Sequence, residues 1–413
     1  MLEKLAIEGG EKAVSSGLKA RFHFGKEEQA AADALFAEAI RSGNAFGYNG
    51  PQEEAFCREF AEFLGVKYAD GTNSGTNSVF VALHALGLPP FSEVIVSPVT
   101  DPGGIMPIVM LNCIPVVADS APGRYNTDAE QIRKRITPLT KAIVVAHIGG
   151  EPADMRGICA LAKEHGLPVV EDCAQSHGAT LDGKFVGTFG TYGAFSLMFG
   201  KHFCTGGQGG AVVCNDGELY WNERRAADRG KPFNRPGHTN SLPALNCNMD
   251  ELHAAIGRVQ LRKLPQIVTG RRNFAHMLLE RGLGELGAVT IPETIPGGVN
   301  SYWWWRLKYN ADAMKCDKKT FCAALSAEGV SLNPEYNGAL PFNFEWFKDR
   351  QNKHPWNNPL YKGTVTDPDC PNAIQAVREH FNLTVLESWG ETEADEIYHA
   401  FAKVTAYYKK LNP

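Results

Sequence analysis

The order of hydrophobic and polar positions predicts alternating helices and strands in the first half of the chain. Helical spacing of apolar residues covers 27–42, 53–64, 77–86 and 155–165. Short apolar or β-branched runs lie between and after these stretches, at 67–70, 94–97, 115–118, 142–147, 167–170, 194–198 and 211–214. Continuous apolar strands separated by helices indicate an α/β fold with a parallel sheet covered on both faces. Ligands are then expected just beyond the carboxyl ends of the strands.

The pattern changes after about residue 264, where a smaller α+β region is expected. A helix is predicted at 251–264, before this change. After it, helices are predicted at 271–281, 318–328 and 391–411, with an aromatic strand at 302–309 and loops at 292–300 and 333–358. We therefore predict an N-terminal segment with a large domain over residues 1–263 and a small C-terminal domain over residues 264–413.

Composition narrows the class of protein. The 413 residues carry a formal net charge of −5, with 21% charged and 44% hydrophobic residues, an ordinary globular balance. The mild acidity disfavours a nucleic-acid binder with a basic footprint. No apolar run has the length of a membrane span and the start does not read as a secretory signal, so a cytoplasmic location is expected. The ten cysteines lack metal-ligand spacing, and no metal site is predicted.

Two motifs in the first half are candidates for ligand binding. In Asn73-Ser74-Gly75-Thr76, backbone N–H groups and hydroxyls at the start of a helix suit a phosphate, although for this motif alone an ordinary helix cap is the better explanation. In Glu171-Asp172-Cys173-Ala174-Gln175, the carboxylate of Asp172 follows a buried strand and can pair with a cationic ring nitrogen. A helix cap or turn is the alternative for that carboxylate.

Two further motifs follow near residue 200. Lys201 comes five residues after Ser196, at the end of a predicted strand. Burial there would lower the pKa of the lysine and make its amine a nucleophile, whereas most lysines are solvated surface residues. The glycine-rich run 206–210 requires a tight turn directly afterwards.

Taken in this order, the motifs resemble those of pyridoxal-phosphate enzymes of the aspartate-aminotransferase fold type. The resemblance is strongest to the DegT/StrS-type sugar aminotransferases and covers nearly the whole chain, including residues 5–10, 47–50, 246–249 and 251–257. It implies a large, mostly parallel seven-stranded sheet sandwiched by helices, with a smaller C-terminal α+β domain.

The resemblance also implies roles for individual residues. Lys201 would hold pyridoxal 5'-phosphate as a Schiff base, and Asp172 would keep the pyridine nitrogen protonated. Gln175 would lie against the ring or near its phenolic oxygen. The phosphate would be bound by Gly75, Thr76 and Ser196. Asn246 would reach the phosphate in the neighbouring subunit, which makes a homodimer with shared active sites the expected assembly.

The chain departs from the family pattern at several positions. Asp101 stands where the family places an aromatic residue that stacks on the cofactor. As a cofactor-binding candidate, Asp101 can hydrogen-bond an acceptor hydroxyl or an amine, unless the correspondence shifts by a few residues in this loop. Gln208 and Asn248 replace a usual glutamate and arginine. The run 303–305 of three tryptophans replaces a histidine-containing strand; core packing is the preferred explanation and carbohydrate stacking the alternative.

The expected function is therefore that of an aminotransferase. The donor would be L-glutamate or L-glutamine, and the acceptor a free or nucleotide-linked keto-sugar or a keto-cyclitol. One alternative is a pyridoxal-phosphate-dependent sugar dehydratase, although such enzymes carry histidine at the lysine position and here His202 is only adjacent to Lys201. Another is a non-catalytic regulatory protein that binds the same cofactor. The loop 333–358 and the region of Asp101 are expected to select the acceptor.

Overall fold

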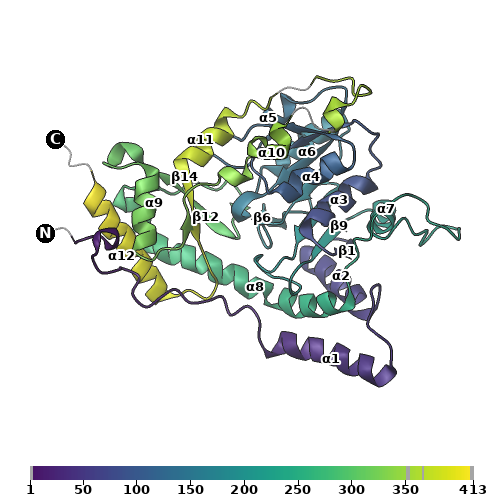
Figure 1. Cartoon of the computed structure of the whole chain (residues 1–413), viewed down its shortest axis with the longest axis horizontal. Coiled ribbons are helices and arrows are strands. Elements are labelled where there is room, and N and C mark those ends of the chain that lie inside the picture. Colours follow the sequence, from purple (N-terminus) through teal and green to yellow (C-terminus); the bar gives the residue numbers. More distant parts are fainter. Residues whose placement is uncertain (1–2, 350–353, 365–366, 410–413) are drawn as a thin grey trace.

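A computed structural model describes residues 3–349, 354–364 and 367–409 (Figure 1). Its centre is the predicted seven-stranded sheet. In spatial order the strands are β1 (Tyr68–Thr72), β9 (Gly210–Cys214), β8 (Tyr192–Ser196), β5 (Val169–Asp172), β4 (Thr140–Ala146), β2 (Glu93–Val96) and β3 (Ile114–Val117). Only β9 runs antiparallel to its neighbours, so the expected mostly parallel sheet is confirmed.

Helices cover both faces of this sheet because its strands are apolar on both sides. On β2, Val94 and Val96 pack into one buried cluster and Ile95 into another on the opposite face. The first face is covered by α3 (Gly75–Ala85), α4 (Pro102–Met110) and α7 (Gly217–Ala227). The second is covered by α2 (Pro51–Leu64), α5 (Ala129–Arg133), α6 (Met155–His165) and the first half of α8 (Glu251–Glu280).

The C-terminal part forms a second, smaller sheet. Its antiparallel order is β10 (Val289–Thr290), β12 (Trp304–Tyr309), β14 (His380–Thr384) and β13 (Leu332–Asn333). Packed against it are α9 (Lys318–Ala327), α12 (Glu391–Tyr408) and the second half of α8. A third small sheet joins β11 (Gly298–Val299), β6 (Thr180–Leu181) and β7 (Lys184–Phe185). The remaining helices are α1 (Lys26–Ser42), α10 (Glu345–Lys348) and α11 (Pro371–Glu379).

The prediction of two separate helices at 251–264 and 271–281 is wrong, because α8 is one continuous helix with Pro265 inside it. Proline removes a hydrogen bond from a helix, but packing offsets that loss here. Leu264 lies in the core beneath the large sheet, while Phe274 lies in the core of the small sheet. The predicted boundary between residues 263 and 264 falls within this helix, and the division into domains stays a prediction.

The other predicted helices and strands are present with ends shifted by a few residues, and the predicted end of the last helix at 411 lies outside the described residues. The elements that were not predicted are the helices α4, α5, α7, α10 and α11 and the strands β6, β7, β10, β11, β13 and β14. No described helix has the length and apolar character that crossing a membrane requires; the cytoplasmic location stays a prediction.

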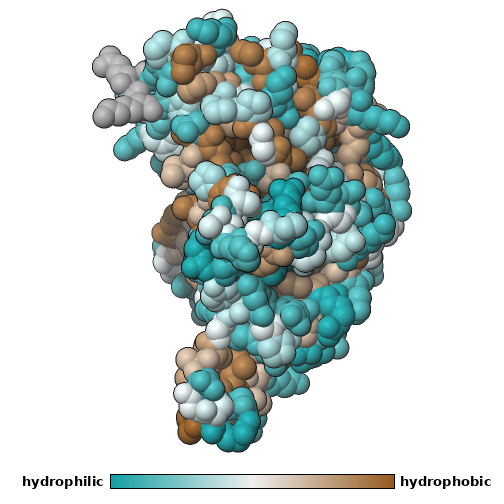
Figure 2. All heavy atoms as spheres, turned by 90° about the vertical axis from the view of Figure 1, so that its right-hand side faces the viewer, coloured by the Kyte–Doolittle hydropathy of each residue, from teal (hydrophilic) through white to brown (hydrophobic). Residues whose placement is uncertain are grey.

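Helix α1 lies at the periphery of the molecule (Figure 1). It contacts α8, where Lys263 pairs with Glu27 and Glu28. In the view of Figure 2 the lower end of the molecule is a narrow projection with hydrophobic side chains on its surface. Phe36 and Ile40 of α1 are 50% and 81% exposed. This helix therefore presents apolar surface that the chain itself does not cover.

Candidate active site

A cavity of about 190 Å³ lies beyond the ends of β5 and β8, beside the starts of α3 and α4. This is the edge of the sheet where the strand pattern predicts ligand binding. The lining residues are Ser74, Gly75, Thr76, Val79, Asp101, Gly103, Gly104, Asp172, Ala174, Ser196, Met198, Lys201 and Gln208. Six of the eight predicted site residues thus come together here, the exceptions being Gln175 and Asn246.

One end of the cavity is formed by the turn between β1 and α3. The hydroxyl of Ser74 caps the helix by accepting from the N–H of Asn77 at 3.1 Å. The N–H groups of Gly75 and Thr76 have no acceptor among the described residues. A Cβ atom on Gly75 would lie 2.4 Å from the Cβ of Ser196, so only glycine lets this turn approach β8 so closely. Free N–H groups at a helix start beside a serine hydroxyl fit a phosphate.

Asp172 lies at the end of β5 and is 7% exposed. Its Oδ1 accepts from the N–H of Ala174 at 3.0 Å. A Cβ atom on Gly104 would lie 2.8 Å from Oδ2, so the first turn of α4 passes close to this carboxylate. Burial raises the pKa of Asp172, while the Ala174 hydrogen bond and the charge of Lys201 oppose the rise. A cationic ring nitrogen at this oxygen would stabilise the ionised form.

Lys201 lies in the turn after β8 and is 6% exposed. Burial lowers the pKa of its amine, against the opposing charges of Asp101 and Asp172. Its Nζ has no hydrogen-bond or ion-pair partner among the described residues, and it lies 4.0 Å from the centroid of the Trp303 ring. A buried amine with a lowered pKa and a free lone pair is the nucleophile that an aldehyde requires.

Gln175 and Asn246 do not line this cavity. Gln175 accepts from the N–H of Gly149 at 2.8 Å and donates to the hydroxyl of Tyr336 at 3.1 Å. Asn246 is exposed, and its side-chain oxygen accepts from the N–H of Asn248 at 3.4 Å. The roles expected for both residues stay predictions.

Two of the departures from the family pattern, at residues 101 and 208, lie at the cavity. Asp101 caps α4, its Oδ1 accepting from the N–H of Gly103 at 3.0 Å, and it lines the cavity with Gln208. Of the three tryptophans, Trp305 is in the core of the small sheet, as the preferred explanation expected. Trp304 packs against Gly149.

Sequence reasoning did not place two aromatic residues where the structure has them, Trp303 beside Lys201 and Tyr336 beside Gln175. Trp303 precedes β12, and its indole N–H donates to the carbonyl of Gly200 at 2.9 Å. Tyr336 comes from the loop that was expected to select the acceptor, and its hydroxyl meets Gln175. The aromatic run and the loop were visible in the sequence, but their distance from Lys201 depends on how the small sheet packs.

One buried group outside the cavity has the residue types of a metal site. Ligand atoms of His147, Glu171 and Cys173 lie within 4.8 Å of one another. His147 Nδ1 accepts from a backbone N–H at 3.0 Å, and the oxygens of Glu171 accept from three backbone N–H groups. Backbone N–H groups thus already occupy Nδ1 of His147 and both oxygens of Glu171, Nε2 of His147 bonds to Glu171 at 3.1 Å, and the cluster ties β4 and β5 to the following loops.

The cavity fits pyridoxal 5'-phosphate in the chemistry of its donors. Lys201 supplies a free amine, Asp172 a buried carboxylate, and the start of α3 a cradle for an anion. A dehydratase is expected to carry histidine in place of Lys201. The neighbouring histidine of this chain, His202, is fully buried, and its Nε2 bonds to the carbonyl of Ser301 at 3.0 Å. It does not line the cavity.

Comparisons with known proteins agree with this arrangement. The pattern of the DegT/DnrJ/EryC1/StrS aminotransferase family matches residues 26–402. The L-glutamine:2-deoxy-scyllo-inosose aminotransferase of Streptomyces lividus is 31% identical over 98% of this chain and 98% of its own length. The dTDP-3-amino-3,4,6-trideoxy-alpha-D-glucose transaminase of Streptomyces venezuelae is 34% identical over 76% of this chain and 83% of its own.

A solved structure shares the fold over nearly the whole chain. The aminotransferase from Psychrobacter cryohalolentis superposes with a TM-score of 0.82 at 27% identity, covering 94% of this chain and 99% of its own. Family and relatives agree on the class of reaction, and the family and the cavity chemistry agree on the cofactor. The chain belongs to the DegT/DnrJ/EryC1/StrS aminotransferase family and is a pyridoxal-phosphate-dependent aminotransferase.

Proposed function

We propose that this enzyme transfers an amino group from L-glutamate or L-glutamine to a keto-sugar or keto-cyclitol, with Lys201 as the residue that bonds to the cofactor. The observation that carries the proposal is the convergence of Lys201, Asp172 and the start of α3 in one cavity. The named activities of the two relatives support the acceptor class, because one acts on an inosose and the other on a nucleotide-linked sugar.

The residues of the cavity divide the binding of the cofactor between them. The N–H groups of Gly75 and Thr76 and the hydroxyl of Ser196 bind the phosphate. Asp172 pairs with the ring nitrogen and holds a proton on it. When bound, the cofactor supplies an electron sink for the carbon that gains or loses the amine.

Lys201 has the second role of moving a proton. Because burial lowers the pKa of Nζ, the unprotonated amine is more readily available than in a solvated lysine. Nζ accepts the proton that the amino-bearing carbon of the donor loses. Later it gives a proton to the carbon of the acceptor that gains the amine. It therefore acts first as a general base and then as a general acid.

We infer that Asp101, which lines the cavity, and Tyr336, which bonds to Gln175, contact the acceptor. Asp101 uses Oδ1 for the cap of α4, which leaves Oδ2 for a hydroxyl of the acceptor. The hydroxyl of Tyr336 accepts from Gln175 and keeps its own proton to donate. A polyhydroxylated sugar or cyclitol offers both donors and acceptors to such a pair.

We also propose that two copies of the chain form a homodimer in which Asn246 serves the partner's site. Asn246 is exposed and lies outside its own cavity, and α1 leaves Phe36 and Ile40 uncovered. Mixing Lys201→Ala and Asn246→Ala proteins tests this arrangement. Mixed dimers would contain one site with both residues intact and regain activity, whereas no recovery would contradict sharing.

The acceptor is tested by two substrates of the kinds that the relatives use. The enzyme loaded with the amine form of the cofactor is mixed with 2-deoxy-scyllo-inosose or with a dTDP-linked keto-sugar. We expect one of them to be aminated and to restore the aldehyde form. Lack of reaction with both classes, in a protein that accepts amine from glutamate or glutamine, would refute the proposed acceptor class while leaving the transferase intact.

A further inference from the structure

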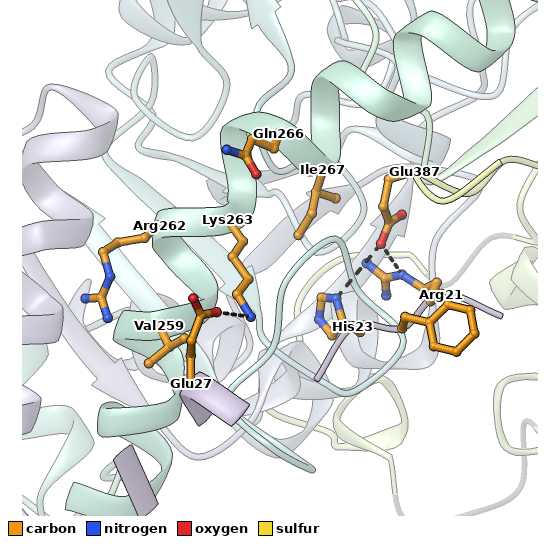
Figure 3. Close-up of a pocket in the computed structure, with 10 residues that line it drawn as sticks. Arg21, His23, Glu27, Val259, Arg262, Lys263, Gln266, Ile267 and Glu387 are labelled. Carbon is orange, nitrogen blue, oxygen red and sulfur yellow. Dashed lines mark hydrogen bonds and ion pairs between the residues drawn. The ribbon is translucent and has the colours of Figure 1, made fainter. Parts of the chain in front are cut away.

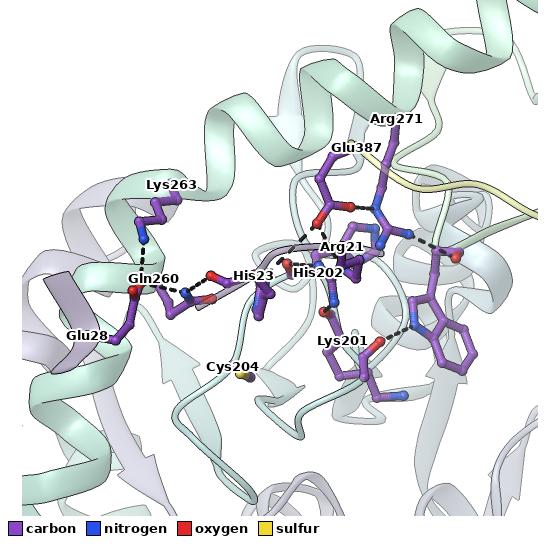
Figure 4. Close-up of polar contacts among 12 residues, drawn as sticks. Arg21, His23, Glu28, Lys201, His202, Cys204, Gln260, Lys263, Arg271 and Glu387 are labelled. Carbon is purple, nitrogen blue, oxygen red and sulfur yellow. Dashed lines mark hydrogen bonds and ion pairs between the residues drawn. The ribbon is translucent and has the colours of Figure 1, made fainter. Parts of the chain in front are cut away.

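Three consecutive backbone carbonyls around Lys201 are bound by side chains from distant parts of the chain. The indole N–H of Trp303 donates to the carbonyl of Gly200 at 2.9 Å. Arg21 donates from Nη1 to the carbonyl of Lys201 at 2.7 Å and from Nη2 to that of His202 at 2.5 Å. Figure 4 shows the guanidinium of Arg21 beside this turn. The turn is therefore fixed through its main chain, which leaves Nζ without a hydrogen bond.

Arg21 is itself held by Glu387, which it shares with a second arginine. Its Nε donates to Oε1 of Glu387 at 2.7 Å, and Nε of Arg271 donates to Oε2 at 2.9 Å. The side chains of Arg21, Glu387 and Arg271 are 16%, 11% and 2% exposed. Burial acts to raise the pKa of Glu387, but the two guanidinium groups hold it below its usual value. The carboxylate is thus ionised, and its bonds to both arginines are of the strong, charge-assisted kind.

Arg271 supports Lys201 from the other side. It projects from α8 and donates from Nη1 to the carbonyls of Tyr302 and Trp303 at 2.9 and 3.0 Å. These bonds fix the segment whose aromatic ring lies 4.0 Å from Nζ of Lys201. Glu387 therefore connects two supports of Lys201, one at its main chain through Arg21 and one at its amine through Arg271 and Trp303.

The segment that carries Arg21 is anchored before and after it. The indole N–H of Trp389 donates to the carbonyl of Lys19 at 2.9 Å, and Gln260 donates to the carbonyl of His23 at 2.8 Å. Gln260 and Lys263 of α8 also bind Glu28 at the start of α1 (Figure 4). The main chain on both sides of Arg21 is therefore held in place where its side chain contacts the turn of Lys201.

We propose that Arg21, Glu387 and Arg271 form a clamp that positions Lys201 for reaction with the cofactor. The proposal rests on the proposed role of Lys201. None of the three lines the cavity, so they are positioning residues that act through the turn of Lys201 and through Trp303. The clamp holds the main chain of the Lys201 turn and the segment that carries the Trp303 ring. It thereby orients Nζ without forming a hydrogen bond to it.

The test compares Arg21→Met, the conservative Arg21→Lys and Glu387→Gln with a matched control, Arg262→Met. Arg262 lines the same solvent-accessible hollow as Arg21 and Glu387, but it points away from them in Figure 3. Cofactor-free proteins are mixed with pyridoxal 5'-phosphate, and the covalent capture rate is read from visible absorption. The affinity for pyridoxamine 5'-phosphate, which cannot bond to Lys201, is measured alongside.

We expect both Arg21→Met and Glu387→Gln to slow capture by about 10- to 100-fold, because misplacing a reacting atom by about 1 Å has this order of effect. Arg21→Lys should recover only part of the rate, since one ammonium group cannot reach all three partners. Binding of pyridoxamine 5'-phosphate should change less than threefold, and Arg262→Met should match the unchanged protein in both measurements.

Unchanged capture in Arg21→Met and Glu387→Gln would overturn the clamp. Equal loss of capture and of pyridoxamine 5'-phosphate binding would also overturn it, because it would reveal a general structural role. Failure of the unchanged protein to capture pyridoxal 5'-phosphate through Lys201 would instead refute the proposed function on which the clamp rests.

Discussion

The amine of Lys201 lies 4.0 Å from the centroid of the Trp303 ring, which approaches it from the segment leading into the small sheet. An aromatic face attracts an ammonium group, whereas burial disfavours its charge. Burial prevails, since the pKa of Lys201 is lowered overall. The ring thus restrains the amine in place while leaving it largely able to react.

The first prediction concerns the face of this ring. Trp303→Leu removes both the face and the indole N–H that binds Gly200, whereas Trp303→Phe removes only the N–H. We expect covalent capture of pyridoxal 5'-phosphate to slow in both variants, by about tenfold in Trp303→Leu and less in Trp303→Phe, because each loses a hydrogen bond worth roughly 1 kcal/mol and Trp303→Leu also loses the ring that packs against Nζ. Equal rates in Trp303→Leu and the unchanged protein would show that the ring does not restrain Nζ.

The pH dependence of capture tests the electrostatics of Lys201. Capture requires unprotonated Nζ, so its rate rises with pH through the pKa of this amine. Burial lowers that pKa, and the charge of Asp101 opposes the lowering. Asp101→Asn removes the opposing charge, so the midpoint of the rate profile should move to lower pH. Asp33→Asn, at an exposed position on α1, is the control and should leave the midpoint in place. A midpoint that rises in Asp101→Asn would contradict this account.

Asp172→Asn separates capture from catalysis. The amide keeps the shape of the side chain and can still accept from the N–H of Ala174, but it cannot hold a proton on the ring nitrogen. We expect capture through Lys201 to persist while the rate of amino transfer falls by about 100- to 1,000-fold, the usual effect of losing one preorganised electrostatic partner. Single-turnover kinetics with L-glutamate measure this difference, and a loss below tenfold would exclude the proposed pairing.

Gly75→Ala tests the close approach of α3 to β8. The added Cβ would lie 2.4 Å from the Cβ of Ser196, which forces the turn to shift. We expect a loss of about 1–3 kcal/mol in stability, as is typical of overpacking, together with weaker binding of pyridoxamine 5'-phosphate. Thermal unfolding and a binding titration check both. Gly47→Ala is the matched control, because a Cβ there meets nothing within 4 Å. Identical behaviour of the two variants would refute the tight fit at residue 75.

The large sheet could be predicted from the sequence because its strands are local, apolar runs. The run 142–147 lies between polar segments, and its residues are buried on both faces of the sheet. The position of Asp172 follows directly from such a strand. By contrast, α4 begins with Pro102-Gly103-Gly104, a sequence typical of turns, and forms a helix because Asp101 caps it and Ile105 and Ile108 are buried.

The contacts of Lys201 could not be predicted, because they depend on packing between parts of the chain far apart in sequence. Arg21 lies 180 residues before Lys201, and Trp303 reaches the turn through a carbonyl 103 residues away. An arginine or a tryptophan at those positions has no local pattern that distinguishes it from a surface or core residue. The continuous helix α8, with Pro265 inside it, was missed for the same reason.

The most direct test of the central claim is the first half of the reaction without any acceptor. The protein loaded with pyridoxal 5'-phosphate is mixed with L-glutamine or L-glutamate, and both the cofactor absorption and the keto acid are followed. We predict that at least one donor converts the cofactor to its amine form with an equal amount of keto acid, and that Lys201→Ala shows neither the visible absorption of a bonded lysine nor the conversion. Conversion by Lys201→Ala at the unchanged rate, or no conversion of the unchanged protein by either donor, would contradict the account.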